Sequence, residues 1–341
     1  MKETIKTLPA KYYHDADIYA AETENIFKNE WLLIGHEAAL DKEGSYLAKT
    51  IAGYAIFVIR DKDGSLKAYH NVCRHRASPL LDDGIGRTSV LRCPYHGWVY
   101  NTDGQLKKIP DFADDKEIEQ KVCDRTHLFK VHVRSWRKLV FICMAEGEAP
   151  DFDKSLGDLP AACEGTDIEN FFFHSAAKHE LKCNWKTYVE NYMEGYHIPT
   201  IHPELNKEVD METYFVYPED RIARHVTDTQ VEDGTMGGLW VWLWPYAALN
   251  IYKEGMNLEL MVPTGPETVE LHYAYFFRDL ENADEIKRTI AASKSVTQED
   301  IDVCERVQKN LASGIYDTGE LSPRHEGGLA YFQKLVKDSV G

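Results

Sequence analysis

The sequence is poor in long hydrophobic runs and in positive charge. Its longest nearly apolar run, Leu239 to Leu249, is about half as long as a membrane span requires and contains Pro245, so we expect no spanning helix. Met1 to Lys11 lacks the apolar core of a secretory signal. Lys and Arg number 39 against 56 Asp and Glu, a formal net charge of −17. This charge argues against a nucleic-acid partner and is compatible with a cationic small-molecule substrate.

Motifs for binding nucleotides are also missing. The segment Gly84-Ile85-Gly86 lacks the third glycine and the strand–helix context of a dinucleotide site. There is no P-loop, no G-x-S-x-G and no plant-type ferredoxin cysteine run. We therefore do not expect the chain to take hydride from NAD(P)H itself. Its seven cysteines, an odd number, argue against a disulfide framework and favour metal ligands or buried thiols in a reducing cytoplasm.

The length of 341 residues and the hydrophobic content of 43% suit a folded protein of about two domains. The chain has three stretches of different character. Residues 1–38 mix acidic and aromatic residues with a helical pattern, and we expect this segment to pack on the third stretch, residues 151–341. Residues 39–150 alternate short strands with turns, which is typical of a small all-β domain. Residues 151–341 predict an antiparallel sheet closed by C-terminal helices, so the fold class expected for the whole chain is α+β.

The expected elements follow from hydrophobic periodicity and turn residues. They are strands at Tyr54–Ile59, Leu66–Asn71, Trp98–Tyr100, Lys138–Met144, Phe171–Leu181, Leu239–Leu249, Leu258–Val262 and Val269–Phe277, a helix at Asn184–His197, and helices from Ala283 onward.

Two short pairs each combine a cysteine with a histidine. They are Cys73-Arg74-His75 and Cys93-Pro94-Tyr95-His96. A zinc finger instead groups Cys with Cys and His with His. A Rieske [2Fe–2S] centre needs one of each residue type from each loop, because one iron takes two Cys and the other takes two His. Core cysteines beside surface histidines would explain one such pair, but not two.

A second group of metal-ligand residues lies in the third stretch. Helical spacing predicts that Glu190, Glu194 and His197 share one face of a helix. Pro199 and Pro203 break that helix, so His202 can turn back toward His197. Two His and one carboxylate form the facial triad of non-haem Fe(II) oxygenases. For His197 alone, a buried core histidine would be the better interpretation.

The carboxylate of this triad is expected from a later helix, Thr297–Leu311. Its predicted apolar stripe contains Val303, Cys304, Val307 and Leu311, and Asp300 lies on the same stripe. A carboxylate on a buried stripe needs a counter-charge, which a ferrous ion would supply. An acid that complements the helix dipole is the alternative. Asp302 is expected on the opposite side and Glu299 on the rim.

These motifs resemble those of a known family. Cys73-x-His75 and Cys93-x-x-His96-Gly97-Trp98 are similar to the cluster motif of Rieske proteins, and Glu190-Asn191-Tyr192-Met193-Glu194-Gly195-Tyr196-His197-x4-His202 resembles the catalytic motif of Rieske non-haem iron oxygenases. The resemblance implies a Rieske domain over residues 39–150 and a helix-grip catalytic domain over residues 151–341. It also implies mononuclear Fe(II) on His197, His202 and Asp300, with Asn191 close to it.

The resemblance has further implications for partners. In this family a carboxylate before the first His bridges the cluster of one subunit to the iron of the next, commonly in a head-to-tail homotrimer. The bridging residue is usually Asp, whereas here it is Glu194, which resembles the subset that includes carnitine monooxygenase. Electrons are expected from a separate NAD(P)H-dependent flavin and iron–sulfur reductase.

The expected function is that of a terminal oxygenase that uses O₂ to hydroxylate a C–H bond of a quaternary ammonium compound of the choline, betaine or carnitine type. An aromatic surface of Trp240, Trp242, Trp244 and Tyr246, with the tryptophans at period two along one strand, would bind the cation by cation–π contacts. A packed sheet face without a ligand is the alternative for these four residues. Cis-dihydroxylation of an aromatic ring remains open, as does an electron carrier without oxygenase activity.

Overall fold

The structure, a computed structural model, describes residues 5–227 and 238–341. The chain divides into two compact units: Met1–Leu32 together with Pro150–Gly341, and Leu33–Ala149. The first boundary lies six residues before the expected one at residue 38, because residues 33–36 belong to a strand of the second unit. Among the described residues, no helix has the length and apolar character needed to cross a membrane.

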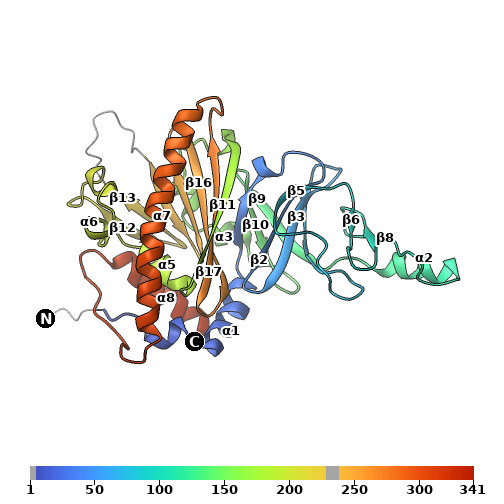
Figure 1. Ribbon diagram of the computed structural model, residues 1–341, viewed down its shortest axis with the longest axis horizontal. Helices are drawn as coiled ribbons and strands as arrows, with labels where there is room; N and C mark the ends of the chain where they lie inside the picture. Colours follow the sequence, from blue (N-terminus) through green and yellow to red (C-terminus); the bar gives the residue numbers. More distant parts are fainter. Residues whose placement is uncertain (1–4, 228–237) are drawn as a thin grey trace. The chain divides into compact units, whose positions relative to one another are not determined.

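The unit Leu33–Ala149 consists mainly of two antiparallel sheets (Figure 1). The larger sheet has the order β1-β10-β9-β4-β3-β2-β5 and the smaller one β6-β7-β8. Their strands are β1 (Leu32–His36), β2 (Ser45–Ile51), β3 (Tyr54–Arg60), β4 (Leu66–His70), β5 (Gly84–Arg87), β6 (Leu91–Arg92), β7 (Val99–Tyr100), β8 (Leu106–Lys108), β9 (Lys130–Trp136) and β10 (Leu139–Cys143); one turn η3 (Glu37–Ala39) and one helix α2 (Lys116–Arg125) complete the unit.

The core of this unit lies directly beneath the two Cys–His loops. Phe57, Tyr69 and Tyr100 pack in one buried cluster that also contains Cys73 and Cys93. Close packing of the two cysteines against this core fixes the backbones of the loops. The residues that follow each cysteine, 74–76 and 94–96, are exposed.

The other unit is built on a seven-stranded antiparallel sheet of order β11-β17-β16-β15-β14-β13-β12. Its strands are β11 (Phe172–Leu181), β12 (Phe215–Glu219), β13 (Ile222–Val226), β14 (Leu239–Leu243), β15 (Ala247–Ile251), β16 (Gly255–Gly265) and β17 (Thr268–Phe277). The prediction of one strand from Leu239 to Leu249 is wrong. Residues 244–246 form a turn around Pro245, so that β14 and β15 pair with each other, Leu239 opposite Ile251.

Helices cover this sheet, and Figure 1 shows the long α7 running across one of its faces. The helical elements are η1 (Ala10–Tyr13), α1 (Ala16–Glu22), η2 (Thr23–Phe27), α3 (Phe152–Ser155), α4 (Leu159–Ala162), η4 (Ile168–Asn170), α5 (Trp185–Tyr192), α6 (Ile198–Ile201), η5 (Leu205–Lys207), α7 (Ala283–Leu311) and α8 (Gly327–Val340). Helix α5 packs on both α7 and β16. It ends at Tyr192, so the prediction of one helix through His197 is wrong.

The N-terminal segment packs into this same unit through buried polar contacts. The carboxylate of Glu22 accepts hydrogen bonds from Nζ of Lys186 at 2.5 Å and from Nε1 of Trp185 at 2.8 Å. The side chains of Glu22 and Lys186 are both completely buried. Separating the two side chains would leave an uncompensated charge inside the protein. The pair therefore keeps the end of helix α1 in contact with the first turn of α5.

Candidate functional site

In the unit Leu33–Ala149, two tight turns hold the sulfur atoms of Cys73 and Cys93. The N–H of Ala77 donates to the carbonyl of Cys73, and the N–H of Gly97 to that of Cys93, both at 3.0 Å. Ala77 (φ 57°) and Gly97 (φ 70°) adopt left-handed conformations that close these turns. Both sulfurs are buried and they interact with each other.

Backbone N–H groups surround the two sulfurs. Burial would raise the pKa of the Cys93 thiol, but hydrogen bonds from the backbone N–H groups of Tyr95 and His96 leave its pKa below the usual value. The Tyr100 hydroxyl lies 3.3 Å from Sγ of Cys73, although burial still raises the pKa of that thiol. Such donors suit sulfur ligands that carry negative charge.

The imidazole rings of His75 and His96 lie at the exposed ends of the same turns. Their centroids are 4.5 Å apart, and His75 also stacks on Trp98 with centroids 4.8 Å apart and an interplanar angle of 3°. Two buried sulfurs and two outer imidazoles therefore converge. This donor set fits a binuclear iron–sulfur cluster with sulfur ligands on one iron and nitrogen ligands on the other.

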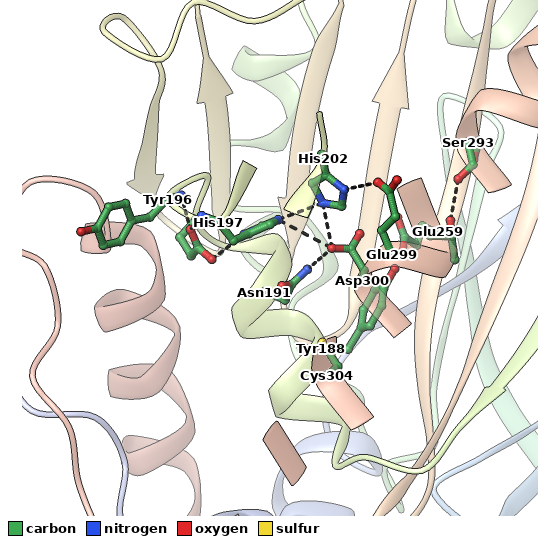
Figure 2. A network of polar contacts seen from close by, with 12 residues as sticks. Tyr188, Asn191, Tyr196, His197, His202, Glu259, Ser293, Glu299, Asp300 and Cys304 are labelled. Atoms are coloured by element: carbon green, nitrogen blue, oxygen red, sulfur yellow. Dashed lines mark hydrogen bonds and ion pairs between the residues drawn. The ribbon is translucent and has the colours of Figure 1, made fainter. Parts of the chain in front are cut away.

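In the other unit, the turn after α5, the end of α6 and helix α7 bring His197, His202 and Asp300 together (Figure 2). Their ligand atoms all lie within 4.8 Å of one another. The Nε2 atoms of the two imidazoles are 3.1 Å apart, and Oδ1 of Asp300 lies 3.0 Å from Nε2 of His202 and 3.6 Å from Nε2 of His197.

A carboxylate or an amide positions each of these three side chains. Nδ1 of His197 is 2.6 Å from Oε1 of Glu194, and Nδ1 of His202 is 2.7 Å from Oε2 of Glu299. Nδ2 of Asn191 donates to Oδ1 of Asp300 at 2.7 Å.

These contacts leave three acceptors facing one another. If each Nδ1 carries the proton that its carboxylate partner accepts, both Nε2 atoms present lone pairs toward the Asp300 carboxylate. A cation among the three would stabilise the arrangement, and two imidazoles with one carboxylate match the donor set of non-haem Fe(II) sites. The three residues therefore fit a mononuclear iron.

Part of the helix-face prediction is wrong. Because α5 ends at Tyr192, Glu194 and His197 lie in the following turn, and Glu190 alone of the three is on the helix. Gly195 allows this turn to pack closely, since a Cβ there would lie 2.1 Å from the ring of Tyr214. The stripe on α7 also differs: Asp300 is buried as expected, but Val307 is 43% exposed.

Glu190 faces the N-terminal segment instead. Oε1 of Glu190 accepts hydrogen bonds from the Tyr13 hydroxyl at 2.7 Å and from Nε2 of Gln333 at 3.0 Å. Burial raises the pKa of this carboxyl to about 7, although both hydrogen bonds oppose the shift. The folded state therefore favours the protonated form of Glu190.

A prediction for stability follows from this raised pKa. The ionised form destabilises the folded state increasingly as pH rises from about 4.5 to about 7. Glu190→Gln should leave stability unchanged near pH 4.5 and raise the free energy of unfolding by up to about 3 kcal/mol at pH 8. Thermal melting of both proteins at the two pH values measures this. An equal change at both pH values would contradict the raised pKa.

A cavity of about 890 Å³ opens beside the His–His–Asp cluster. Its lining combines aromatic rings with acids. Among the described residues, the aromatic ones are Tyr188, Tyr192, Tyr214, Trp240, Tyr252, Tyr273, Tyr275 and Phe277, and the carboxylates are Glu194, Glu204, Glu208, Glu254, Glu259, Asp279, Glu285, Glu299 and Asp300. Lys253 is the one Lys or Arg in the described lining.

The predicted aromatic surface contributes less to this cavity than expected. Of its four residues, Trp240 is part of the described lining. Trp242 packs on Phe332, and Tyr246 on Phe27, inside the core. Trp244 lies in the turn after β14, with its Nε1 donating to Glu30. The turn at Pro245 ends the alternation of side chains along the strand and so displaces Trp244 and Tyr246. Trp242 is on β14 with Trp240, but Phe332 of α8 packs against its ring.

Sequence reasoning missed two carboxylates of this site. Glu299 was expected on the rim of α7, but it bonds the His202 ring. Glu259 was not singled out, although it interrupts the apolar run of β16 and is only 4% exposed. An isolated acid within an apolar strand is a signal that could have identified it.

Comparisons with known proteins agree with this geometry. Residues 168–341 match the family model "Ring hydroxylating alpha subunit (catalytic domain)", and residues 30–128 match "Rieske [2Fe-2S] domain". The choline monooxygenase of Atriplex hortensis is 28% identical over 97% of this chain and 77% of its own length. The carnitine monooxygenase oxygenase subunit of Escherichia coli K12 is 29% identical over 97% of this chain and 92% of its own.

A solved structure supports the same relationship. A quaternary ammonium Rieske monooxygenase, described for carnitine oxidation and inter-subunit electron transfer, is 27% identical with a TM-score of 0.87, over 99% of this chain and 96% of that one.

These findings confirm the α+β fold class, the oxidoreductase class and both expected cofactors, a Rieske [2Fe–2S] cluster and a mononuclear iron. An electron carrier without oxygenase activity is excluded, because the match includes the catalytic domain. The chain therefore belongs to the ring-hydroxylating alpha-subunit family of Rieske non-haem iron oxygenases.

Proposed function

We propose that this oxygenase hydroxylates a C–H bond next to the nitrogen of a quaternary ammonium compound. The observation that carries the proposal is the cavity beside His197, His202 and Asp300, whose lining is both aromatic and acidic. Aromatic faces and carboxylates stabilise a cation that cannot donate hydrogen bonds, whereas an aromatic hydrocarbon gains nothing from nine carboxylates. The similarity to choline and carnitine monooxygenases supports the same substrate class.

We assign the cofactor ligands as the sequence predicts. Cys73, His75, Cys93 and His96 would hold the cluster, and His197, His202 and Asp300 the iron. When bound, the cluster supplies single electrons and the iron ion supplies the activation of O₂. Asn191 holds Oδ1 of Asp300, and Glu299 holds the ring of His202, so both side chains keep their ligand atoms turned toward the metal position.

The role proposed for Glu194 is a link between subunits of a homotrimer. Its Oε1 contacts Nδ1 of His197, and its side chain remains 10% exposed, so a partner's imidazole could reach the same carboxylate. Inter-subunit electron transfer in the related quaternary ammonium monooxygenase supports this assignment. A separate NAD(P)H-dependent reductase would supply the electrons. None of the seven cysteines forms a disulfide, which supports the expected location in a reducing cytoplasm.

The substrate proposal is tested by product formation with a generic reductase. Choline, betaine and carnitine should each be compared with naphthalene and benzoate for O₂-dependent product. Hydroxylation of a carbon next to nitrogen gives a carbinol whose C–N bond breaks, so each turnover should release an aldehyde together with a tertiary amine and a proton. Better turnover of the aromatic compounds would overturn the quaternary ammonium assignment, while the chain would still be an oxygenase.

The cluster assignment gives a separate prediction. Cys93→Ser should abolish the EPR signal of the reduced Rieske cluster, because a hydroxyl is a much poorer ligand for iron than a thiolate. Residues 151–341 should keep their fold, which circular dichroism and mononuclear iron content would show. Cys123→Ser is the matched control: it changes another buried thiol of the same unit and should leave the signal intact. A surviving signal in Cys93→Ser would overturn the assignment.

A further inference from the structure

Glu259 is a buried carboxylate in the wall of the cavity (Figure 2). It lies on β16, is 4% exposed, and its Oε1 accepts a hydrogen bond from the Tyr273 hydroxyl at 2.5 Å. A buried carboxylate is stable in its charged form only when a positive charge or several donors compensate it.

The other acids in the interior of the cavity already have partners at the metal position. Asp300 faces the two imidazoles, and Glu194 and Glu299 each bond one of them. Glu259 has no such partner: its side-chain hydrogen bonds come from the neutral phenols of Tyr273 and Tyr188. It is therefore the carboxylate that a cationic ligand can reach without competing with the metal site.

Apart from the metal position itself, the described lining offers no buried positive charge to a ligand's own carboxylate. In the described lining, the single cationic side chain is Lys253, which is 90% exposed and lies 3.9 Å from Glu254. Residues 228–237, which lie outside the described part, contain no Lys or Arg in the sequence. His225 is buried, and burial lowers its pKa to about 3, so it is neutral at physiological pH.

Three neutral donors in the lining, Tyr192, Asn250 and Trp240, are engaged with other side chains of the same lining. The Tyr192 hydroxyl donates to Oδ1 of Asn250, and Nδ2 of Asn250 donates to Oδ1 of Asn257. Nε1 of Trp240 donates to the Tyr252 hydroxyl. A ligand carboxylate that used these three donors would have to break their bonds, in a cavity whose described lining already contains nine carboxylates.

His225 offers a neutral polar atom that remains available to a ligand. Nε2 of His225 is buried without a hydrogen-bond partner among the described residues, while its Nδ1 contacts the Tyr214 hydroxyl at 2.6 Å. His225 lines the cavity, so its free nitrogen can bond an uncharged polar group such as a hydroxyl.

We infer that the cavity selects a quaternary ammonium compound that carries no carboxylate, with Glu259 as the counter-charge of the ammonium group and His225 as the partner of an uncharged polar end. This inference rests on the proposed function and refines it: a cationic alcohol fits, whereas a zwitterionic betaine of similar size does not. Glu259 is thus a specificity-determining residue.

Equilibrium binding to the anaerobic holoenzyme, measured by calorimetry, tests the inference without turnover. Choline and glycine betaine share a trimethylammonium head and differ in the hydroxyl or carboxylate at the other end. Choline should bind at least about tenfold more tightly than glycine betaine. The uncharged isostere 3,3-dimethylbutan-1-ol should bind at least about tenfold more weakly than choline, because it lacks the positive charge.

Two variants assign this preference to Glu259. Glu259→Gln retains an acceptor for the Tyr273 hydroxyl and removes the negative charge. It should weaken choline binding by about tenfold, and the ratio between the affinities for choline and glycine betaine should become smaller. Glu180→Gln removes an exposed carboxylate of β11 outside the cavity and should leave the affinity unchanged. Burial raises the pKa of Glu259 to about 7, so at neutral pH the glutamine should not destabilise the fold; retained iron content and a melting temperature no lower than that of the unsubstituted protein would show that Glu259→Gln is folded.

The outcomes separate the two proposals. If glycine betaine or carnitine binds as tightly as choline, or if Glu259→Gln keeps the full preference for choline, the selection against carboxylates is overturned and the quaternary ammonium proposal stands. If none of the quaternary ammonium compounds binds, both are overturned.

Discussion

Asp300→Ala should remove the mononuclear iron and abolish product formation. The change deletes the carboxylate that lies 3.0 Å from Nε2 of His202, and two imidazoles alone bind Fe(II) weakly. Metal analysis should fall from three irons per chain to two. The EPR signal of the reduced Rieske cluster should persist, because Asp300 belongs to the other unit of the chain.

Asp302→Ala is the matched control on the same helix. Asp302 is exposed, and Oδ1 accepts a hydrogen bond from Nε2 of Gln298 one turn earlier. Its loss should change stability by no more than about 0.5 kcal/mol and leave three irons per chain. Loss of iron in Asp302→Ala with retention in Asp300→Ala would contradict the assignment of the ligand.

Glu194→Gln should slow oxidation of the reduced cluster by about a hundredfold in a single turnover with O₂ and substrate. Glutamine keeps an oxygen that can accept from Nδ1 of His197, so the ring keeps its orientation and both metal sites should remain filled. What is lost is the negative charge and the second acceptor oxygen, which accepts from the backbone N–H groups of Tyr196 and His197, in the side chain for which the link to a partner's cluster is proposed. Stopped-flow absorbance of the cluster measures the rate.

Glu299→Gln distinguishes an electron link between subunits, the role proposed for Glu194, from a role that only orients a histidine ring. It makes the same change at the carboxylate that holds His202. Slow cluster oxidation confined to Glu194→Gln is the result expected of a link between subunits. Equal slowing in both variants would point to orientation of the imidazoles, and a normal rate in Glu194→Gln would remove Glu194 from the electron path.

The convergence of His197, His202 and Asp300 was predictable because each residue carries a local signal. Pro199 and Pro203 bracket His202, and Asp300 occupies the buried face of a strongly periodic helix. The Cys–His spacing of the two turns in the other unit is equally local. Each of these signals depends only on residues that are close together in the chain, so it can be recognised in a single sequence.

Two of the predictions that were wrong, the positions of Glu190 and Val307, depend on contacts between segments that are distant in the chain. Helical spacing grouped Glu190 with Glu194, but Tyr13 and Gln333, far away in sequence, determine where Glu190 lies. Gln308 is buried in place of Val307 because its side chain bonds the carbonyl of Tyr13 and the N–H of Asn184. Tertiary hydrogen bonds of this kind override the local preference for apolar residues inside, and no periodicity reveals them.

The junction between the two units has a consequence for domain exchange. Nε1 of Trp31 donates to the carbonyl oxygen of Pro150 at 2.7 Å, so the chain leaves and re-enters the catalytic unit at neighbouring points. The Rieske unit is in this sense an insertion in a split domain, an arrangement that folded domains tolerate when the two ends are adjacent. Chimeras between relatives should therefore exchange Leu33–Ala149 as one block. A fusion made at a single crossover would separate residues 1–32 from their own partners, and Lys186 would face a foreign segment in place of Glu22.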